Sequence, residues 1–148
     1  MLNIHASCVA WQNQGILIFG PSGAGKSDLC LRLIAEHGAV LIADDRSEIE
    51  LRGEKLLAAA PANIRGKLEV RGIGIADVPF VSDIPLALAV QIVPPDSEIE
   101  RLPLPQRYKV AGGSLPLIKI HAFEASAPAK MLLALKIGGT CDEKQQAC

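Results

Sequence analysis

The sequence predicts an α/β fold built around a phosphate-binding loop, with a mixed, strongly bent sheet and helices mainly on one side. A glycine-rich segment joins an apolar strand pattern to a helical pattern. After that helix, strand patterns outnumber those that alternating β-α-β units would supply. Apolar residues form 49% of the 148 residues and aromatic ones only 3%, so one aliphatic core is expected.

The N-terminal third should hold three strands and one helix. Strands are expected at residues 4–11 and 16–19, joined by a turn over residues 12–15. The helix that opens at Lys26 has a broad apolar face and is expected to end at Gly38, which suits a left-handed cap. The all-apolar run 39–43 predicts a buried strand.

The rest of the chain predicts more strands and a second helix. Strand patterns occupy residues 48–51, 55–59, 67–71 and 115–120, and residues 86–93 are expected to form a central strand. Residues 96–106 should be an irregular surface excursion. A helix should start at residues 126–128, with Pro128 in its first turn, and end at Gly138 and Gly139. We expect one domain over residues 1–139 and a frayed tail over 140–148.

The strongest motif is a complete G-x-x-x-x-G-K-S loop between the strand at 16–19 and the first helix. Its members are Gly20, Pro21, Ser22, Gly23, Ala24, Gly25, Lys26 and Ser27. Backbone N–H groups of such a loop, together with the helix dipole, favour a bound polyphosphate. Lys26 is expected to reach the phosphates, and Ser27 to bind Mg²⁺. The alternative is a glycine-rich turn without a ligand.

Two carboxylates, Asp44 and Asp45, end the strand at 39–43. If this strand lies beside the one that enters the loop, both face the terminal phosphate. They can then serve the metal and orient or deprotonate an acceptor. The alternative is an ordinary turn, in which Asp is favoured.

Three further residues are candidates. His5 gains interest only if its strand pairs with the loop strand, and otherwise is a surface residue. Glu69 and Arg71 should share one face of the strand at 67–71. There Glu69 can complete a Mg²⁺ shell and Arg71 can hold phosphoryl oxygens, unless this face only meets water.

Composition limits the other classes of function. A net charge of −1 gives no case for a nucleic-acid partner. No run approaches the roughly 18 apolar residues of a membrane span, and no signal peptide is recognisable. Cys8 and Cys30 sit in apolar patterns and should be buried, whereas Cys141 and Cys148 lie in the tail. A cytoplasmic protein with free thiols is expected.

Four segments, in this order, resemble the catalytic C-terminal domain of HPr kinase/phosphorylase. They are residues 5–7, 20–27, 41–45 and 68–75. The resemblance implies a P-loop fold of the phosphoenolpyruvate-carboxykinase-like type, in a compact form without the family's N-terminal domain. It also implies a serine kinase that uses ATP and Mg²⁺ to phosphorylate an HPr-like phosphocarrier, and a homo-oligomer, often a hexamer.

The resemblance assigns roles to the candidate residues. Lys26 and its loop would bind ATP, while Ser27 and Glu69 would ligate Mg²⁺ with support from Asp44. Asp45 would accept the proton of the substrate serine, with His5 beside it.

One departure weakens the phosphorylase reading. The family carries an arginine in a Gly-Arg-Asn context, but residues 110–115 hold none. Kinase activity is therefore better supported than phosphorolytic dephosphorylation. A small-molecule kinase and a nucleotide-binding regulatory module with little catalysis remain alternatives.

Overall fold

The computed structural model describes residues 1–141, so most of the expected tail, including Cys148, lies outside the described residues. The strands are β1 (Leu2–Ile4), β2 (Ser7–Trp11), β3 (Gln14–Phe19), β4 (Val40–Ala43), β5 (Ser47–Arg52), β6 (Lys55–Ala59), β7 (Lys67–Val70), β8 (Gly74–Asp77), β9 (Ile84–Ile92), β10 (Gln106–Val110) and β11 (Gly113–Ile120). The helices are α1 (Lys26–His37), α2 (Ala127–Ile137) and the short 3-10 turn η1 (Ala62–Ile64).

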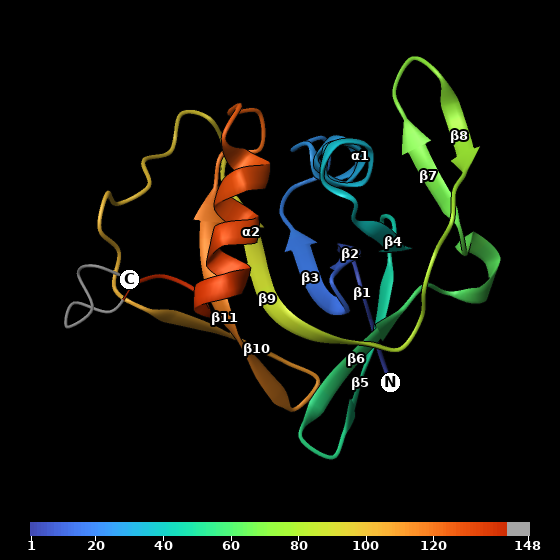
Figure 1. The fold of residues 1–148 in the computed structure, drawn as a ribbon, viewed down its shortest axis with the longest axis horizontal. Helices are drawn as coiled ribbons and strands as arrows, with labels where there is room; N and C mark the ends of the chain where they lie inside the picture. The colour runs from blue at the N-terminus through green and yellow to red at the C-terminus, as the bar shows by residue number, and fades with distance from the viewer. Residues whose placement is uncertain (142–148) are drawn as a thin grey trace.

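Most strands form one curled, mixed sheet (Figure 1). Its order is β1-β5-β6-β9-β3-β2-β4, and the β10–β11 hairpin joins through β11, which pairs parallel to β9. β9 also pairs parallel to β3 and, at its start, antiparallel to β6. β7 and β8 form a separate hairpin. The expected central strand is therefore confirmed as β9.

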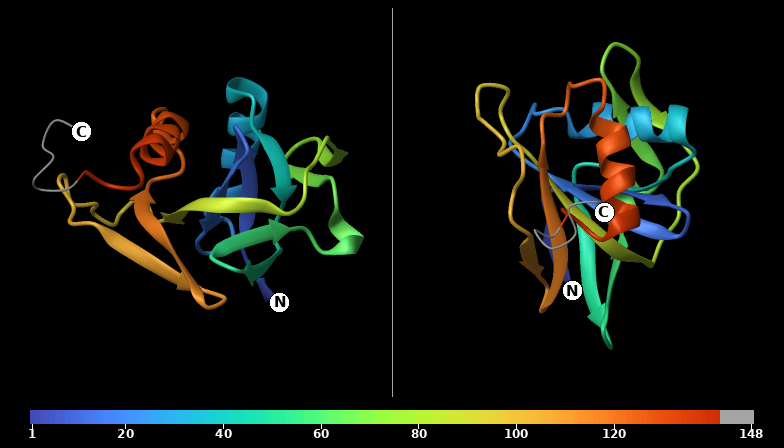
Figure 2. Two further views of the ribbon diagram at one scale, coloured as in Figure 1. Left: turned by 60° about the horizontal axis from the view of Figure 1, so that its bottom comes forward. Right: turned by 60° about the vertical axis from the view of Figure 1, so that its left-hand side comes forward.

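The core has two layers, one on each face of the curled sheet. Both helices bury their apolar sides on the first face, where Leu29, Leu33 and Met131 pack against Ile18 and Val90. On the second face the sheet packs against itself, because β5, β6 and β10 curl over it (Figure 2). The prediction of an α/β fold with a bent mixed sheet and helices mainly on one side is confirmed.

Both helices end as the sequence predicts. Gly38 and Gly138 cap them in the left-handed conformation, with φ of 75° and 84°. In each cap the glycine N–H donates to a carbonyl of the last helical turn, which satisfies a group that the helix leaves unpaired.

The expected single strand over residues 4–11 is wrong. The chain bends at His5, where the Ala6 N–H donates to the Ile4 carbonyl at 3.1 Å. β1 then pairs with β5, while β2 pairs with β3 and β4. The apolar pattern continues through the bend because both sides of it are covered, so the pattern hides the break.

The expected neighbourhood of β3 and β4 is also wrong, because β2 lies between them. β4 runs antiparallel to β2, and β2 runs antiparallel to β3. β3 and β4 therefore point the same way, and their C-terminal ends meet at one edge of the sheet. Asp44 still reaches the loop, although one strand farther away than expected.

The sequence does not predict β8 or β10. β8 begins at Gly74, beyond the expected strand at 67–71, and Gly72 and Gly74, both at positive φ, turn the chain into a hairpin. β10 begins at Gln106, the last residue of the expected excursion, and pairs with β11 through a tight turn. Its exposed residues Arg107 and Lys109 carry little strand signal, while Tyr108 stacks on Phe19 at 4.5 Å between ring centroids.

Neighbouring leucines of α2 provide a test of the first core layer. Leu132 is 9% exposed and Leu133 is 59% exposed. Leu132→Ala should lower the free energy of unfolding by about 2–5 kcal/mol, because it leaves a cavity in the core. Leu133→Ala should change it by less than about 0.5 kcal/mol. Urea denaturation followed by circular dichroism measures both, and equal losses would contradict the packing of α2.

The two buried thiols should be inert. Burial raises the pKa of Cys8 and of Cys30, and the carboxylate of Asp44 raises that of Cys30 further. In a variant with Cys141 and Cys148 replaced by Ser, iodoacetamide at pH 8 should leave native protein unmodified and label both remaining thiols in urea. Mass spectrometry counts the adducts. A labelled Cys30 in native protein would contradict the burial of α1 against the sheet.

Candidate active site

The glycine-rich loop (residues 20–27) connects β3 to α1, as the sequence predicts. Its turn uses left-handed glycines, with φ of 77° at Gly23 and 105° at Gly25. Lys26 is the first residue of α1, and its Nζ donates to the carbonyl oxygens of Gly20 at 2.9 Å and Pro21 at 3.0 Å. The lysine ammonium thus lies over the loop at the positive end of the helix.

Lys26 is only 7% exposed, and its surroundings act on its charge in opposite directions. Burial lowers the pKa of the ammonium, while the carboxylates of Asp45 and Asp44 raise it. A phosphate group bound at this loop would add to the stabilisation of the charged form.

Asp44 joins the surrounding elements. It is 6% exposed, and its Oδ1 accepts the hydroxyls of Ser27 at 2.7 Å and Ser7 at 3.0 Å. Its Oδ2 accepts the backbone N–H of Glu69 at 3.0 Å. One carboxylate therefore connects α1, β2 and β7 to the end of β4.

Asp45 points away from that cluster toward solvent, with 72% of its side chain exposed. Its φ of 69° lies in the left-handed region, which Asp tolerates better than most residues. The Asp45 N–H donates to the Ser7 hydroxyl at 3.2 Å, and the Asp45 carboxylate meets His5 Nε2 at 2.9 Å. The backbone conformation thus directs two adjacent carboxylates to different partners.

His5 lies in no strand, but the strand that follows it, β2, pairs with the loop strand β3. His5 occupies the bend immediately before β2. The structure therefore brings His5, Lys26, Ser27, Asp44 and Asp45 to one edge of the sheet.

A cavity of about 500 Å³ opens beside the two aspartates. Its walls come from β1, the segment around η1 and the β7–β8 hairpin, and its lining residues are Asn3, Asp44, Asp45, Arg46, Pro61, Asn63, Ile64, Lys67, Glu69 and Ile75. Lys67 forms an ion pair with Asp77 across the hairpin. The cavity is large enough for a side chain of another molecule to approach Asp45.

Glu69 and Arg71 are separated by the end of β7, so the expectation that they share one strand face is wrong. Glu69 lies in β7 and lines the cavity. Arg71 lies in the hairpin turn, exposed, and is absent from the described lining of this cavity. The strand ends at Val70 because the chain turns back toward β8.

The motif at residues 5–7 includes Ser7, but the sequence predicts no role for this residue. It is fully buried, and its hydroxyl donates to Asp44 while it accepts the Asp45 N–H. A single serine at the start of a strand carries no sequence signal for a positioning role, so this role becomes visible only in the folded structure. Ser47, also fully buried, donates to the Ala6 carbonyl at 2.9 Å and holds the bend beside it.

The oxygen atoms at this edge are of the kind that Mg²⁺ prefers. Ser27 Oγ and Asp44 Oδ1 already lie 2.7 Å apart, and Glu69 adds a carboxylate at the cavity wall. Within residues 1–141 no group of three or more His, Cys, Asp or Glu side chains forms a complete metal cage. Mg²⁺ needs no such cage, since it usually keeps several waters and binds substrate phosphates, so these residues fit it.

Neither described helix has the length and apolarity required to cross a membrane.

Ser7→Ala tests the hydrogen bonds that position the aspartates. It removes a donor to Asp44 and leaves the Asp45 N–H unpaired, so the free energy of unfolding should fall by about 1–3 kcal/mol. Ser114→Ala is the matched control, because Ser114 accepts from Arg107 at an exposed site and should cost less than about 1 kcal/mol. Equal losses in urea denaturation would contradict the positioning role of Ser7.

The chain matches known proteins over nearly its whole length. The family model described as HPr Serine kinase C-terminal domain matches residues 1–134. The HPr kinase/phosphorylase of Caldicellulosiruptor bescii is 35% identical over 127 residues, which are 78% of this chain and 40% of that protein. That of Levilactobacillus brevis is 37% identical over 110 residues, or 68% of this chain and 35% of that protein.

The fold matches as well as the sequence. The solved structure of the Hpr(Ser) kinase/phosphatase from Coxiella burnetii superposes with a TM-score of 0.77 at 27% identity, covering 93% of each chain. The chain spans about two fifths of the length of the two curated relatives above. The match to the family model covers the edge of the sheet with the loop and both aspartates, and the resemblance drawn from the motifs is confirmed: the chain belongs to the HPr serine kinase C-terminal domain family.

Proposed function

We propose that this chain is an ATP- and Mg²⁺-dependent protein-serine kinase that phosphorylates an HPr-like phosphocarrier of the phosphotransferase system. One observation carries the proposal: Ser27, Asp44, Asp45 and His5 meet at the mouth of the glycine-rich loop, beside a cavity open to an acceptor. Family membership supports the reaction class and the acceptor. A cytoplasmic location belongs to the same proposal.

The loop is the proposed phosphate site, in a P-loop fold of the phosphoenolpyruvate-carboxykinase-like type. Backbone N–H groups at the start of α1 and the ammonium of Lys26 offer positive charge to the same place. Lys26 would leave the carbonyls of Gly20 and Pro21 for phosphate oxygens, which are stronger acceptors.

The proposed metal ligands are Ser27 and Asp44, with Glu69 from the lining of the adjacent cavity. When bound, Mg²⁺ would neutralise charge on the phosphates. Ser7 and the Glu69 N–H fix the Asp44 carboxylate, so this ligand would be held in place before the nucleotide arrives.

Asp45 is the proposed proton acceptor, because its carboxylate faces the cavity. The substrate serine would give its proton to Asp45 as its Oγ forms a bond to the γ-phosphorus and the bond to the β,γ-bridging oxygen breaks, releasing ADP. His5 would hold the Asp45 carboxylate by their 2.9 Å contact. Positioning and charge stabilisation supply most of the catalysis in such transfers.

Two further parts of the proposal concern Arg71 and the reverse reaction and assembly that the resemblance implies. Arg71 would need to approach the phosphates from the hairpin turn, since the structure holds it outside the described cavity lining. Reverse, phosphorolytic dephosphorylation and a homo-oligomer, often a hexamer in this family, are carried by the resemblance alone.

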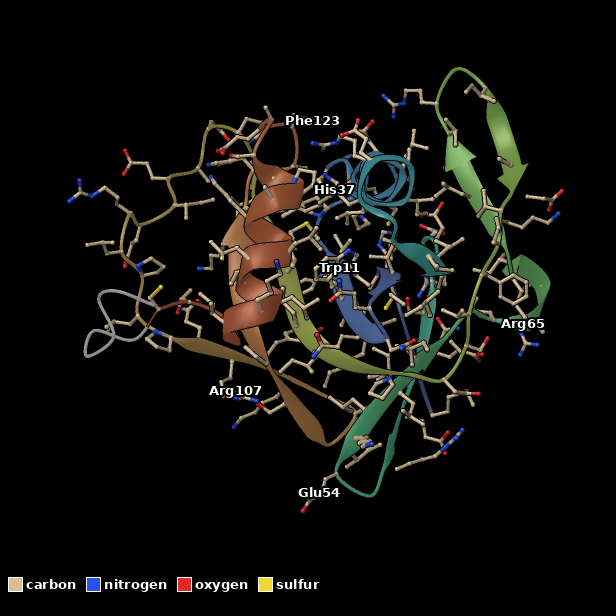
Figure 3. The ribbon with its side chains drawn as sticks, viewed as in Figure 1. Trp11, His37, Glu54, Arg65, Arg107 and Phe123 are labelled. Atoms are coloured by element: carbon tan, nitrogen blue, oxygen red, sulfur yellow. The ribbon has the colours of Figure 1, made fainter. Side chains whose placement is uncertain are left out.

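Intact-mass spectrometry of an HPr-like phosphocarrier incubated with the chain, ATP and Mg²⁺ tests the proposal. One phosphoryl group should be gained on a serine. Asp45→Asn should slow the transfer by about 10²–10⁴-fold, the range for loss of a general base. Glu54→Gln, at the far tip of the β5–β6 hairpin (Figure 3), should match the unaltered protein.

Three outcomes would redirect the proposal. Transfer that survives Asp45→Asn would place the base elsewhere. Absence of transfer, with ATP still raising the melting temperature, would favour the regulatory module. Turnover of nucleoside monophosphates in a coupled assay would favour the small-molecule kinase.

A further inference from the structure

A second cavity, of about 260 Å³, borders the glycine-rich loop. Its lining residues are Ala24, Val93, Pro95, His121, Ala122, Phe123 and Glu124. Ala24 belongs to the loop itself, while the others come from the ends of β9 and β11 and from the segment before α2. Within the described residues, the linings of the two cavities share no member. The second cavity, which is largely apolar, is therefore distinct from the cavity beside Asp44 and Asp45.

Phe123 stands at the boundary of this second cavity and the loop. A β-carbon placed on Gly25 would lie 2.9 Å from Cζ of Phe123, so the ring packs directly on the loop where α1 begins. The ring is nevertheless 64% exposed, and Figure 3 places it in the segment before α2, close to α1. A large aromatic face is thus presented to solvent within reach of a group bound at the loop.

The wall that carries Phe123 is tied to α1. The Arg32 guanidinium donates to the carbonyl oxygens of Ala122 and of Glu124, the latter at 3.3 Å. Arg32 is itself paired with Asp28 one helical turn earlier, at 3.0 Å. The loop and the apolar wall therefore share one support, which holds Phe123 at a fixed position relative to the phosphate site.

The polar groups of the cavity suit a heterocycle better than a phosphate. The Nδ1 atom of His121 is buried and has no hydrogen-bond partner among the described residues, so hydrogen-bonding capacity at the wall is unused. Glu124 is drawn aside by Lys130, whose Nζ donates to Oε2 at 2.7 Å. Its carboxylate would repel a phosphate placed here, whereas a neutral base carries no such penalty.

We propose that this cavity binds the nucleobase of the phosphate donor, with the base stacked on Phe123 while the phosphates extend into the loop. The inference rests on the proposed function, because it assumes a nucleotide at the loop. The cavity is smaller than the roughly 300–1,000 Å³ that encloses a whole drug-sized ligand, which fits the base alone. Stacking on a single exposed ring tolerates every base, so the subsite should prefer nucleotides over inorganic polyphosphates without strong selection among bases.

Isothermal titration calorimetry with ATP and with inorganic tripolyphosphate, both with Mg²⁺, tests the subsite. Phe123→Ala should weaken ATP binding by between about fivefold and about 150-fold, the range for loss of one base–aromatic stack. Tripolyphosphate binding should stay within about twofold. Phe80→Ala is the matched control, because Phe80 is 44% exposed and is absent from the described lining of both cavities. It should alter neither affinity.

Phe123→Trp separates stacking from loop packing, and should keep ATP affinity within about threefold of the unaltered protein. Equal losses of ATP and tripolyphosphate in Phe123→Ala would show that the ring supports the loop, and would overturn the subsite. Unchanged ATP affinity in that variant would overturn it too. A chain that binds tripolyphosphate as tightly as ATP would overturn the base subsite but leave the phosphate loop intact, whereas binding of neither would overturn the proposed function as well.

Discussion

The carboxylate of Asp44 is the constraint on which the geometry of this edge of the sheet depends. Burying a charged oxygen pair is costly unless its hydrogen-bonding capacity is used, and here three donors reach it from three different segments. Those donors belong to the start of β2, the first turn of α1 and the backbone of β7. The β7–β8 hairpin, outside the main sheet, is thereby drawn to the end of β4. The hydrogen bonds that satisfy the buried Asp44 carboxylate therefore also position the β7 side of the cavity.

The adjacent residues Asp44 and Asp45 have different partners, because the backbone enters the left-handed region at Asp45. Asp44 turns inward and Asp45, at positive φ, turns outward toward His5. In an extended strand, the side chains of two successive residues would also point to opposite faces. The left-handed conformation of Asp45 additionally directs its N–H toward the Ser7 hydroxyl. Ser7 thus forms hydrogen bonds with both residues: it donates to the Asp44 carboxylate and accepts from the Asp45 N–H.

Much of this could be read from the sequence, for identifiable reasons. The loop has a fixed spacing, its strand is apolar, its helix has a broad apolar face, and glycines mark both helix ends. The positions of strands and side chains that depend on pairing between distant segments could not be predicted from the sequence. The insertion of β2 between β3 and β4, the break at His5 and the turn that removes Arg71 from the face of Glu69 all depend on which strands pair. The sequence does not indicate a role for Phe123, because a single aromatic residue beyond the last strand can be placed near the loop only from the hydrogen bond that joins its segment to Arg32 of α1.

The pairing of β9 has a consequence for how the chain acquires its structure. Every candidate for phosphoryl transfer lies within the first 71 residues, yet β3, which carries the loop, is flanked by β2 on one side and by β9, at residues 84–92, on the other. β9 in turn is paired with β11, near the end of the described chain. Contacts of such long sequence separation form slowly, because the intervening chain must first be ordered. On a ribosome, the nascent chain would carry the complete set of proposed catalytic side chains well before it could hold them in place.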